Sequence, residues 1–254
     1  MGSDQTTAPA RAAAKRRLPR GSLSREIILA AATTIAQRDG LDGLTFQALG
    51  AELGAHPTAV YRHFRDKDEL TLGLVDALNA EALAALGEPT GDWVADLARL
   101  AHSIHQVFLR HAAVGQMIAA RTARSEHEFR IVERFVSCMR RAGFSDADAA
   151  RYYRAFADFV LAYSALDAAL AALDPDTRRA DLRAWQIEYQ TLPPETYPNT
   201  AAIAHLLPAL DDPGNFAAAL DLMIDAIKAR APAGPAAGNP PRLPADGLPD
   251  GKPR

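Results

Sequence analysis

The stretch HPTAVYRHFRDKDEL (residues 56–70) decides the fold of the N-terminal part of this chain, because it holds one short helix and the start of a longer one. The short helix is predicted to begin at the proline, which is tolerated in a first helical turn because it lacks an N–H. Val60 and Phe64 are four residues apart and therefore share its inner face. A plain core helix would not carry Arg62 and His63 between them. This segment is therefore predicted to present a second face to a partner.

The segments on either side predict further helices. Thr45 is a good N-cap for a short helix that ends at Gly54. A longer helix is predicted to start at Ser24. After the quoted helix, Asp66 and Glu69 form a capping box that begins a long helix. Two short helices joined by a tight turn and backed by a longer one make a helix-turn-helix, which is a DNA-binding motif.

The outer face of the quoted helix carries side chains suited to DNA. Arg62 can bond a guanine in two places, which discriminates against a wrong base by about 1–3 kcal/mol. Tyr61 and Thr58 offer hydroxyl groups, and Pro57, Thr58 and Ala59 can pack against thymine methyl groups. An ordinary exposed helix face explains each residue taken alone. The turn, the two short helices and the capping box together favour DNA binding.

Other polar positions extend this predicted surface. Lys67 lies at the start of the long helix, beside free backbone N–H groups that suit a phosphate. Thr45 lies in the same way at the start of the second helix and also suits a phosphate. Gln47 is expected to be exposed. Residues 1–22 are basic, which fits both an arm in an adjacent minor groove and a solvated, disordered tail.

Residues 44–70, LTFQALGAELGAHPTAVYRHFRDKDEL, resemble the helix-turn-helix of the TetR family of bacterial transcriptional regulators. In that family a Thr-capped helix, an Ala/Gly-containing turn and a Y-x-H-F-x-x-K-x-x-L segment recur. The last is matched here by Tyr61, His63, Phe64, Lys67 and Leu70. The chain departs from the family at His56, where a capping Ser or Thr is common, and at Gly50, where Ala is usual. The resemblance covers about residues 24–72, and the C-terminal half is matched only in layout, length and helix order.

The resemblance implies a set of residues that contact operator DNA, namely Thr45, Gln47, Pro57, Thr58, Ala59, Tyr61, Arg62 and His63. Lys67 would hold a phosphate, and His56 is a weaker candidate for a DNA contact. Regulators of this family are typically homodimers, and they usually bind a small effector within the C-terminal helices. The resemblance therefore implies a repressor that a small-molecule effector releases from a palindromic operator on double-stranded DNA.

The composition fits a soluble protein of one or two domains. The 254 residues are 48% hydrophobic and carry a formal net charge of −3. Cys138 is the only cysteine, which excludes an intrachain disulfide and favours a reducing compartment. The start lacks the apolar core of a secretory signal. The run FVLAYSALDAALAAL is interrupted by Asp167 and is short for a membrane span. A cytoplasmic location without a membrane is predicted.

Helical periodicity continues through the rest of the chain, without an alternating strand pattern. The predicted fold class is all-α, with a helix-turn-helix DNA-binding domain at 23–70 and a larger effector-binding and dimerisation domain at 71–230. A Pro-, Gly- and Ala-rich tail at 231–254 is predicted to be disordered, like residues 1–22. Further helices are expected near 92–110, 111–121, 125–143, 146–173, 175–185, 200–207 and 215–229.

The C-terminal half is predicted to hold the dimer interface and the effector site. By the resemblance, the helices near 146–173 and 215–229 of two subunits form a four-helix bundle. Burial in that bundle would cover an apolar stripe made by Phe216, Leu220, Met223 and Ile227. Effector pockets combine apolar walls with few polar groups, and the candidates here are His105, Phe108, Gln116, Met117, Tyr152, Phe156 and Trp185. Ordinary core packing is the simpler explanation of each.

No cofactor, metal site or enzymatic activity is predicted. His102 and His105 lie three apart, but their helical face has no nearby cysteine or acid to complete a metal site. No G-x-S-x-G, H-E-x-x-H, Walker or G-x-G-x-x-G motif is present. An architectural or activator protein that binds DNA without an effector remains the alternative. It predicts weak sequence preference and a steep salt dependence.

Overall fold

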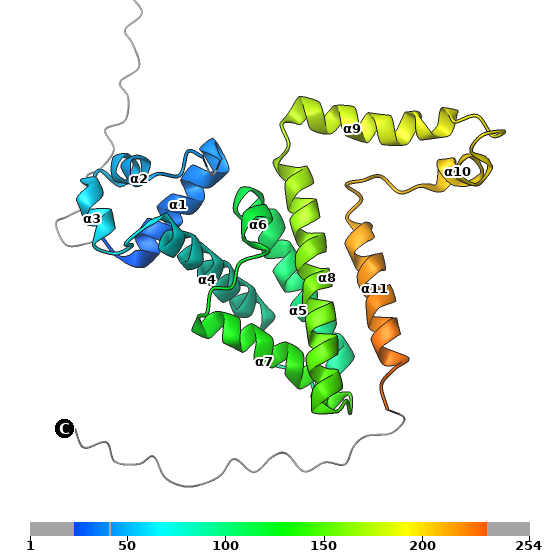
Figure 1. Ribbon diagram of the computed structural model, residues 1–254, viewed down its shortest axis with the longest axis horizontal. Coiled ribbons are helices and arrows are strands. Elements are labelled where there is room, and N and C mark those ends of the chain that lie inside the picture. Colours follow the sequence, from blue (N-terminus) through cyan, green and yellow to red (C-terminus); the bar gives the residue numbers. More distant parts are fainter. Residues whose placement is uncertain (1–22, 41, 233–254) are drawn as a thin grey trace, which may run out of the picture.

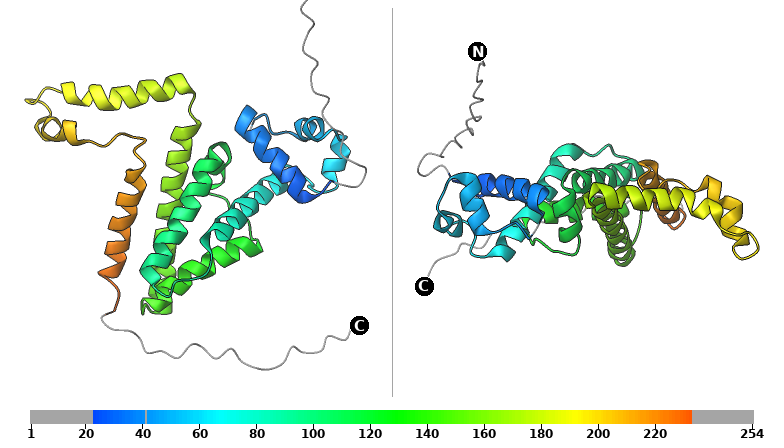
Figure 2. Two further views of the ribbon diagram at one scale, coloured as in Figure 1. Left: turned by 180° about the vertical axis from the view of Figure 1, so that it is seen from behind. Right: turned by 90° about the horizontal axis from the view of Figure 1, so that it is seen from above.

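The structure is a computed structural model that describes residues 23–40 and 42–232. Every regular element in these residues is a helix, as the sequence predicts (Figure 1). The predicted basic arm and nearly all of the predicted tail lie outside the described residues. The helices form a head, a body of longer helices, and an arm that projects from the body (Figures 1 and 2).

The head consists of α1 (Arg25–Asp39), α2 (Phe46–Leu53) and α3 (Pro57–Tyr61), packed against the start of α4 (Lys67–Leu86). The predicted caps form at Ser24, Thr45 and Asp66. The side-chain oxygen of each residue accepts a hydrogen bond from the backbone N–H three residues later in the chain. The inner residues of the head are fully buried, and they include Ile28, Ile35, Leu49, Val60 and Phe64. Local signals therefore place the head helices as expected.

The third helix is shorter than the predicted 57–64. It ends at Tyr61 with Arg62 as its C-cap, and the N–H groups of His63 and Phe64 both bond the Val60 carbonyl, at 2.9 and 3.0 Å. The chain turns here because Asp66 must be extended to cap α4. Arg62 and His63 therefore lie on a turn after α3 and not on its helical face.

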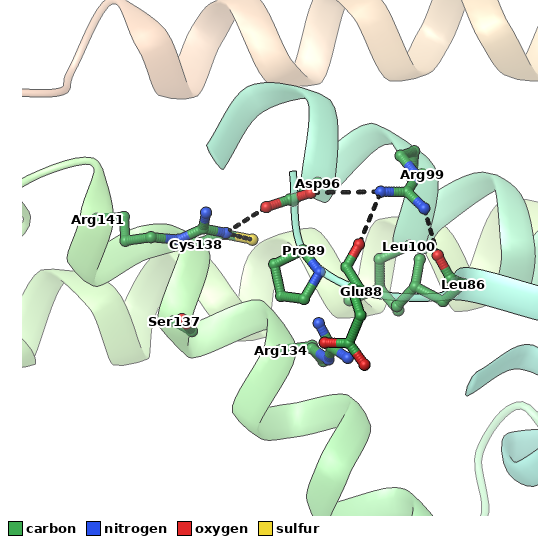
Figure 3. Close-up of a pocket in the computed structure, with 10 residues that line it drawn as sticks. All are labelled: Leu86, Glu88, Pro89, Asp96, Arg99, Leu100, Arg134, Ser137, Cys138 and Arg141. Carbon is green, nitrogen blue, oxygen red and sulfur yellow. Dashed lines mark hydrogen bonds and ion pairs between the residues drawn. The ribbon is translucent and has the colours of Figure 1, made fainter. Parts of the chain in front are cut away.

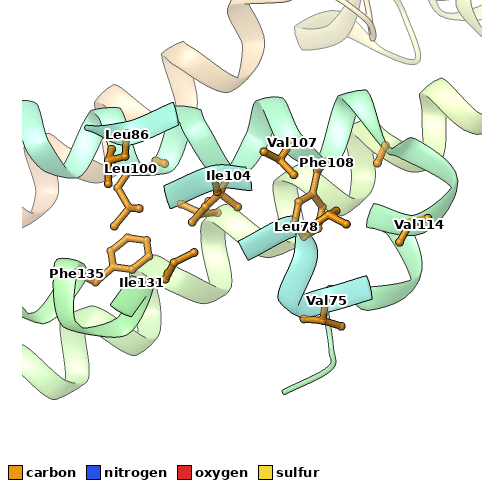
Figure 4. Packing of buried hydrophobic residues seen from close by; sticks show 14 of the residues in the cluster. Val75, Leu78, Leu86, Leu100, Ile104, Val107, Phe108, Val114, Ile131 and Phe135 are labelled. Atoms are coloured by element: carbon orange, nitrogen blue, oxygen red, sulfur yellow. The ribbon is translucent and has the colours of Figure 1, made fainter. Parts of the chain in front are cut away.

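The body contains α5 (Trp93–Arg110), α6 (Ala112–Ile118), α7 (Glu126–Arg141) and α8 (Asp146–Ala172), packed around the rest of α4. Figure 4 shows the apolar side chains that α4, α5 and α7 bring together, among them Leu78, Leu100, Ile104, Phe108 and Phe135. The body and the head share one continuous apolar core, because α4 runs through both.

α8 is the one helix in the described part of the chain that could cross a membrane by length and composition, with a mean hydropathy of 1.5. It spans 27 residues, so it is longer than the apolar run that the sequence analysis judged too short. Part of its apolar surface is covered within the protein. Phe156, Val160 and Ala168 are fully buried against neighbouring helices.

The arm comprises α9 (Pro175–Ile187), η1 (Tyr189–Thr191), α10 (Pro198–Ile203) and η2 (Ala204–Leu206), which pack mainly on one another. It leaves the body at the top of α8 (Figure 1). An ion pair at its base joins Arg178 to Asp211 at 3.0 Å. The arm therefore returns the chain to the body, where the last helix begins.

The last helix, α11 (Gly214–Lys228), corrects one step of the sequence analysis. Its apolar stripe is covered within the chain, because Phe216, Leu220 and Ile227 are buried against α5 and α8. Ile224 is buried in this stripe, whereas Met223 is only half-buried. The stripe therefore needs no second subunit to keep it from water.

Candidate functional site

Arg25 ties the segment after α3 to the rest of the head. Its guanidinium lies 4.0 Å from the centre of the Phe64 ring and 2.9 Å from the Glu69 carboxylate. It also donates to the backbone carbonyl of His63. A cation over an aromatic ring contributes about 0.5–2 kcal/mol. We call residues 57–64, which comprise α3 and the turn after it, the α3 segment. Arg25 thus holds the end of the α3 segment to the start of α1 and to the start of α4.

His56 takes the place of the usual Ser or Thr at the start of α3. Its Nδ1 accepts the backbone N–H of Thr58 at 3.3 Å and lies 2.8 Å from the Thr58 hydroxyl. His56 is thus the N-cap of α3. The first departure from the family pattern therefore preserves the start of the helix.

Two glycines shape the turn between α2 and α3. Gly54 caps α2 at φ 61°, a left-handed conformation that glycine adopts without strain. A Cβ on Gly50 would lie 2.8 Å from the Ala55 carbonyl oxygen and 3.2 Å from Cδ of Pro57. The turn packs directly on α2 in this chain. Glycine in place of the usual alanine makes that approach possible.

The residues predicted to contact DNA are mostly accessible. Exposed side chains belong to Thr45, Gln47, Thr58, Tyr61, Arg62 and Lys67, while those of Pro57, Ala59 and His63 are half-buried. Tyr61 is 54% exposed, and its ring meets the edge of Phe46 with centroids 4.3 Å apart. This contact restricts the ring of Tyr61 beside the start of α2.

An open hollow of about 450 Å³ lies where α2 and α4 begin and the α3 segment ends. It brings together Thr45, Tyr61 and Lys67 from the predicted set, and adds Arg65 and Asp66. Arg65 pairs with Asp66 at 3.1 Å. The N-termini of α2 and α4 meet there beside the cationic side chains of Arg65 and Lys67. This is the arrangement that favours a phosphate.

Neither Arg25 nor Arg65 is among the site residues predicted from the sequence. The partners of Arg25 are 38 and 44 residues away along the chain, so no local pattern marks it. Arg65 lies two residues after His63, and its charge next to the predicted DNA contacts is a usable signal.

A cavity of about 90 Å³ lies in the body between α4, α5, α7, α8 and the end of α6. Its walls include Val75, Ile104, Ile131, Phe135, Val160 and Leu161. Its polar lining is limited to Asn79, Arg121, Glu128 and Tyr153. Few polar groups on apolar walls are typical of small-molecule sites.

Two ion pairs hold the segment beside this cavity to α4. Arg121, after α6, pairs with Asp68 in the first turn of α4. His127 on α7 lies 2.8 Å from Asp76, one residue beyond the cavity wall at Val75. The rim of the cavity is therefore connected to the helix that enters the head.

Comparison with protein families decides the identity of the chain. Residues 28–74 match the bacterial regulatory proteins of the tetR family, and residues 87–231 match the tetracyclin repressor-like C-terminal domain. The second match covers more than half of the chain. The chain belongs to the TetR family.

Individual relatives agree with this TetR-family assignment. The transcriptional repressor Rv1353c of Mycobacterium tuberculosis is 31% identical over 158 residues, 60% of this chain and 60% of that protein. This chain thus spans about 60% of the length of its curated relatives. SCO7222, a TetR regulator of Streptomyces coelicolor, is 28% identical with a TM-score of 0.69 over 83% of this chain and 100% of its own. ActR of S. coelicolor, solved with actinorhodin, shares the fold at 23% identity and a TM-score of 0.72, over 83% and 98%.

Four of the residues predicted for the effector in this TetR-family chain do not line the 90 Å³ cavity, and Met117 has no described side chain. Phe108 and Phe156 are buried in the core, 5% and 0% exposed. Tyr152 is half-buried against Phe144, with ring centroids 4.8 Å apart. Gln116 is exposed, and the side chain of Met117 lies outside the described residues.

The other two predicted residues lie apart from that cavity as well. His105 is stacked on Phe216 at 3.9 Å, and its Nε2 lies 2.8 Å from Asp167. It lines a second cavity of about 180 Å³ near the base of the arm. Trp185 belongs to the arm, where its indole N–H donates to the Pro208 carbonyl at 2.8 Å. The structure therefore does not gather in one place the six predicted residues whose side chains it describes.

A network of polar side chains at the far end of the body surrounds a cavity of only about 20 Å³ (Figure 3). Asp96 accepts hydrogen bonds at 2.8 Å from the N–H and hydroxyl of Thr90 and from Arg141. Burial by itself raises the pKa of Asp96, but these bonds outweigh it and lower the pKa to about 2. Burial raises the pKa of the Cys138 thiol. This network joins α5 to α7, and its cavity has room for no more than a water molecule.

Proposed function

We propose that this TetR-family chain is a transcriptional repressor that binds a palindromic operator as a homodimer and leaves it when a small molecule binds in the body. One observation carries the proposal, namely the two faces of the α3 segment. Val60 and Phe64 are fully buried, while Tyr61 and Arg62 stay exposed beside a hollow of cationic character. Such a face is what reading base edges in a major groove requires.

The proposed DNA contacts divide into two kinds. Arg62, at the end of α3, reads a guanine, and the neighbouring Thr58 and Tyr61 contact base edges or phosphates. Lys67 and the hollow take a backbone phosphate, which positions the head without reading sequence. Losing a contact of the first kind changes specificity, whereas losing one of the second kind changes affinity for every sequence.

Dimerisation is supported by apolar side chains left uncovered on two adjacent helices. Leu166 on α8 is 67% exposed and Leu222 on α11 is 73% exposed. The two helices lie side by side in the views of Figures 1 and 2. A second copy packed there would bury both residues. Two heads would then read half-sites separated by one or more DNA turns of about 34 Å.

The effector is proposed to bind in the 90 Å³ cavity of the body. Its rim is joined to α4 by ion pairs, so a ligand that moves the rim also moves the helix entering the head. By linkage, DNA and the effector weaken each other's binding by the same factor, typically about 1–3 kcal/mol. A repressor of this kind acts in the cytoplasm, where its operator lies, and carries out no enzymatic reaction.

Selection of bound DNA from a random pool, followed by gel-shift titration of the full chain, tests the proposal. A dyad-symmetric site is expected. Arg62→Ala should reduce discrimination at one base pair by the equivalent of about 1–3 kcal/mol. Lys67→Ala should weaken binding to all sequences alike and lower the salt slope by about 1.

Other outcomes would point elsewhere. If Arg62→Ala left base discrimination unchanged, Arg62 would not read a base. Weak preference without dyad symmetry would identify an architectural protein instead of a repressor.

A further inference from the structure

The 90 Å³ cavity is apolar over most of its wall. Of the thirteen described residues that line it, nine are apolar. Val75, Ile104, Ile131 and Phe135 are almost fully buried there (Figure 4). The rings of Phe135 and Tyr153, both on this wall, have centroids 6.0 Å apart. A flat apolar ring would find aromatic and aliphatic contacts at this site.

The two charged residues of the lining are already bonded. Glu128 accepts the backbone N–H of Arg124 at 2.6 Å. Arg121 donates to the carboxylate of Asp68. Their charges are opposite and belong to the same lining, so together they favour neither a cation nor an anion. A charged ligand of either sign would lose its hydration here and would face one like charge of the lining as well as one opposite charge.

The two uncharged polar residues of the lining are available. The side chains of Asn79 and Tyr153 form no hydrogen bond with any residue that the structure describes, and both residues are half-buried. Burial raises the pKa of Tyr153, so its hydroxyl keeps its proton at neutral pH. An amide and a phenol can each donate and accept. They suit a ligand hydroxyl or carbonyl group.

The lining does not favour a metal chelate. Among the described residues it has no histidine or cysteine and a single carboxylate, that of Glu128. In residues 23–40 and 42–232, no three His, Cys, Asp or Glu residues gather in a metal-binding group. Hard and borderline metal ions are held in proteins by such groups.

We propose that the effector is an uncharged, metal-free aromatic compound whose hydroxyl or carbonyl group bonds Asn79 and Tyr153. This inference rests on the proposed function, and it names the chemical class that the proposed site takes. The cavity is smaller than the roughly 150 Å³ that holds benzene in an engineered apolar site. A ligand of two fused rings therefore enlarges it, and the segment that carries Arg121 and Glu128 moves outwards.

Four naphthalene probes of similar size test this class against the full chain by isothermal titration calorimetry. 2-Naphthol is neutral and has a hydroxyl, naphthalene lacks the hydroxyl, 2-naphthoate is an anion, and 2-naphthylmethylamine is a cation at neutral pH. We expect 2-naphthol to bind at least about tenfold more tightly than either charged probe. It should also bind about 2–10-fold more tightly than naphthalene, which is the usual net contribution of one hydrogen bond.

Variants locate the binding. Tyr153→Phe should reduce 2-naphthol affinity about 2–10-fold and leave naphthalene affinity unchanged. Tyr152→Phe is the matched control, because Tyr152 is also half-buried on α8 but packs against Phe144 outside the cavity. Ala157→Trp, which fills the cavity, should abolish the binding of both neutral probes. Circular dichroism confirms that each variant is folded.

Several results would overturn the inference. The first is tighter binding of a charged probe than of 2-naphthol. The second is an equal loss of 2-naphthol affinity in Tyr152→Phe and Tyr153→Phe. The third is no binding of 2-naphthol at its solubility limit. Operator selection is carried out separately on the unliganded chain. If the chain bound a dyad-symmetric operator but preferred a charged probe, the proposed ligand class would be wrong and the proposed function would stand. If 2-naphthol binding depended on Tyr153 but no operator were found, the ligand class would stand and the proposed function would be wrong.

Discussion

The head and the body assemble their functional residues in different ways. The proposed DNA contacts of the head lie within residues 45–67, and caps, one turn and one inner helix face place them. The cavity of the body takes its walls from residues between 75 and 161 on α4, α5, α7, α8 and the end of α6. A site built from neighbouring residues can be recognised from local pattern. A site built from distant helices depends on how those helices pack.

The largest effect is expected from a change that breaks the head alone. Phe64 is fully buried and lies under the guanidinium of Arg25. Phe64→Ala removes a large core side chain and should cost about 3–5 kcal/mol of unfolding free energy. Operator binding should be lost, while 2-naphthol binding persists in the body. Urea unfolding, gel shift and calorimetry measure the three quantities.

Phe129→Ala is the matched control for this change. Phe129 is on α7 and is 59% exposed, so its truncation should stay within about 0.5 kcal/mol. Equal destabilisation by the two variants would show that the head does not depend on the contact between Phe64 and Arg25.

The contrast explains which parts of the fold the sequence could predict. The caps at Ser24, Thr45 and Asp66 act over three residues, and each was predicted and is present. The length of α3 was overestimated, because the need for an extended Asp66 competes with continued helix. Helix periodicity also could not choose between Met223 and Ile224, since both lie near the buried side of α11.

The cavity of the body depends on helix packing that local sequence patterns do not predict. Tyr152 and Tyr153 are adjacent on α8, and composition does not say which faces the cavity. The crossing of α8 with α7 decides it, and brings Tyr153 beside Phe135 while Tyr152 meets Phe144. Trp185 was expected inside the body, but the chain leaves the body after α8 to form the arm. These outcomes depend on contacts between residues far apart in the chain.

An intermediate effect is expected from a change that breaks the body alone. Asp96 lies near the start of α5, beside the C-terminal end of α4. The head packs on the other end of α4, and a 20-residue helix is about 30 Å long. Asp96→Asn weakens bonds to Thr90 and Arg141 and should cost about 1.5–3 kcal/mol at pH 7. Operator affinity at pH 7 should remain within about twofold, a change well below 1 kcal/mol.

The pH dependence of this effect has a defined sign. The pKa of Asp96 is lowered to about 2 from an ordinary value of 3.8. The stabilisation by its carboxylate is therefore complete above pH 4 and is lost as the pH falls towards 2. The difference in unfolding free energy between wild type and Asp96→Asn should shrink over that interval. Asp158→Asn, in an exposed i,i+4 pair with Arg154, is the control and should show little effect.

The smallest stability effect is expected at the junction between the two regions, where Arg121 pairs with Asp68. Both side chains are largely exposed, so Arg121→Ala should cost less than about 1 kcal/mol of unfolding free energy. Its effect on coupling should be larger, because the pair joins the lining of the cavity to the first turn of α4, next to Lys67. Operator affinity without ligand should hardly change, whereas the weakening caused by 2-naphthol should be reduced.

Gel-shift titrations with and without 2-naphthol measure this coupling for Arg121→Ala, Asp68→Ala and the double variant. If the pair transmits the signal, each single variant should reduce the coupling and the double variant should reduce it no further. Arg130→Ala, which removes an exposed pair with Glu126 on α7, should leave it intact. Full coupling in Arg121→Ala would mean that the signal passes through the apolar packing of α4 instead. The shared core would then couple the head to the body, and the ion pair between Arg121 and Asp68 would have no part in that coupling.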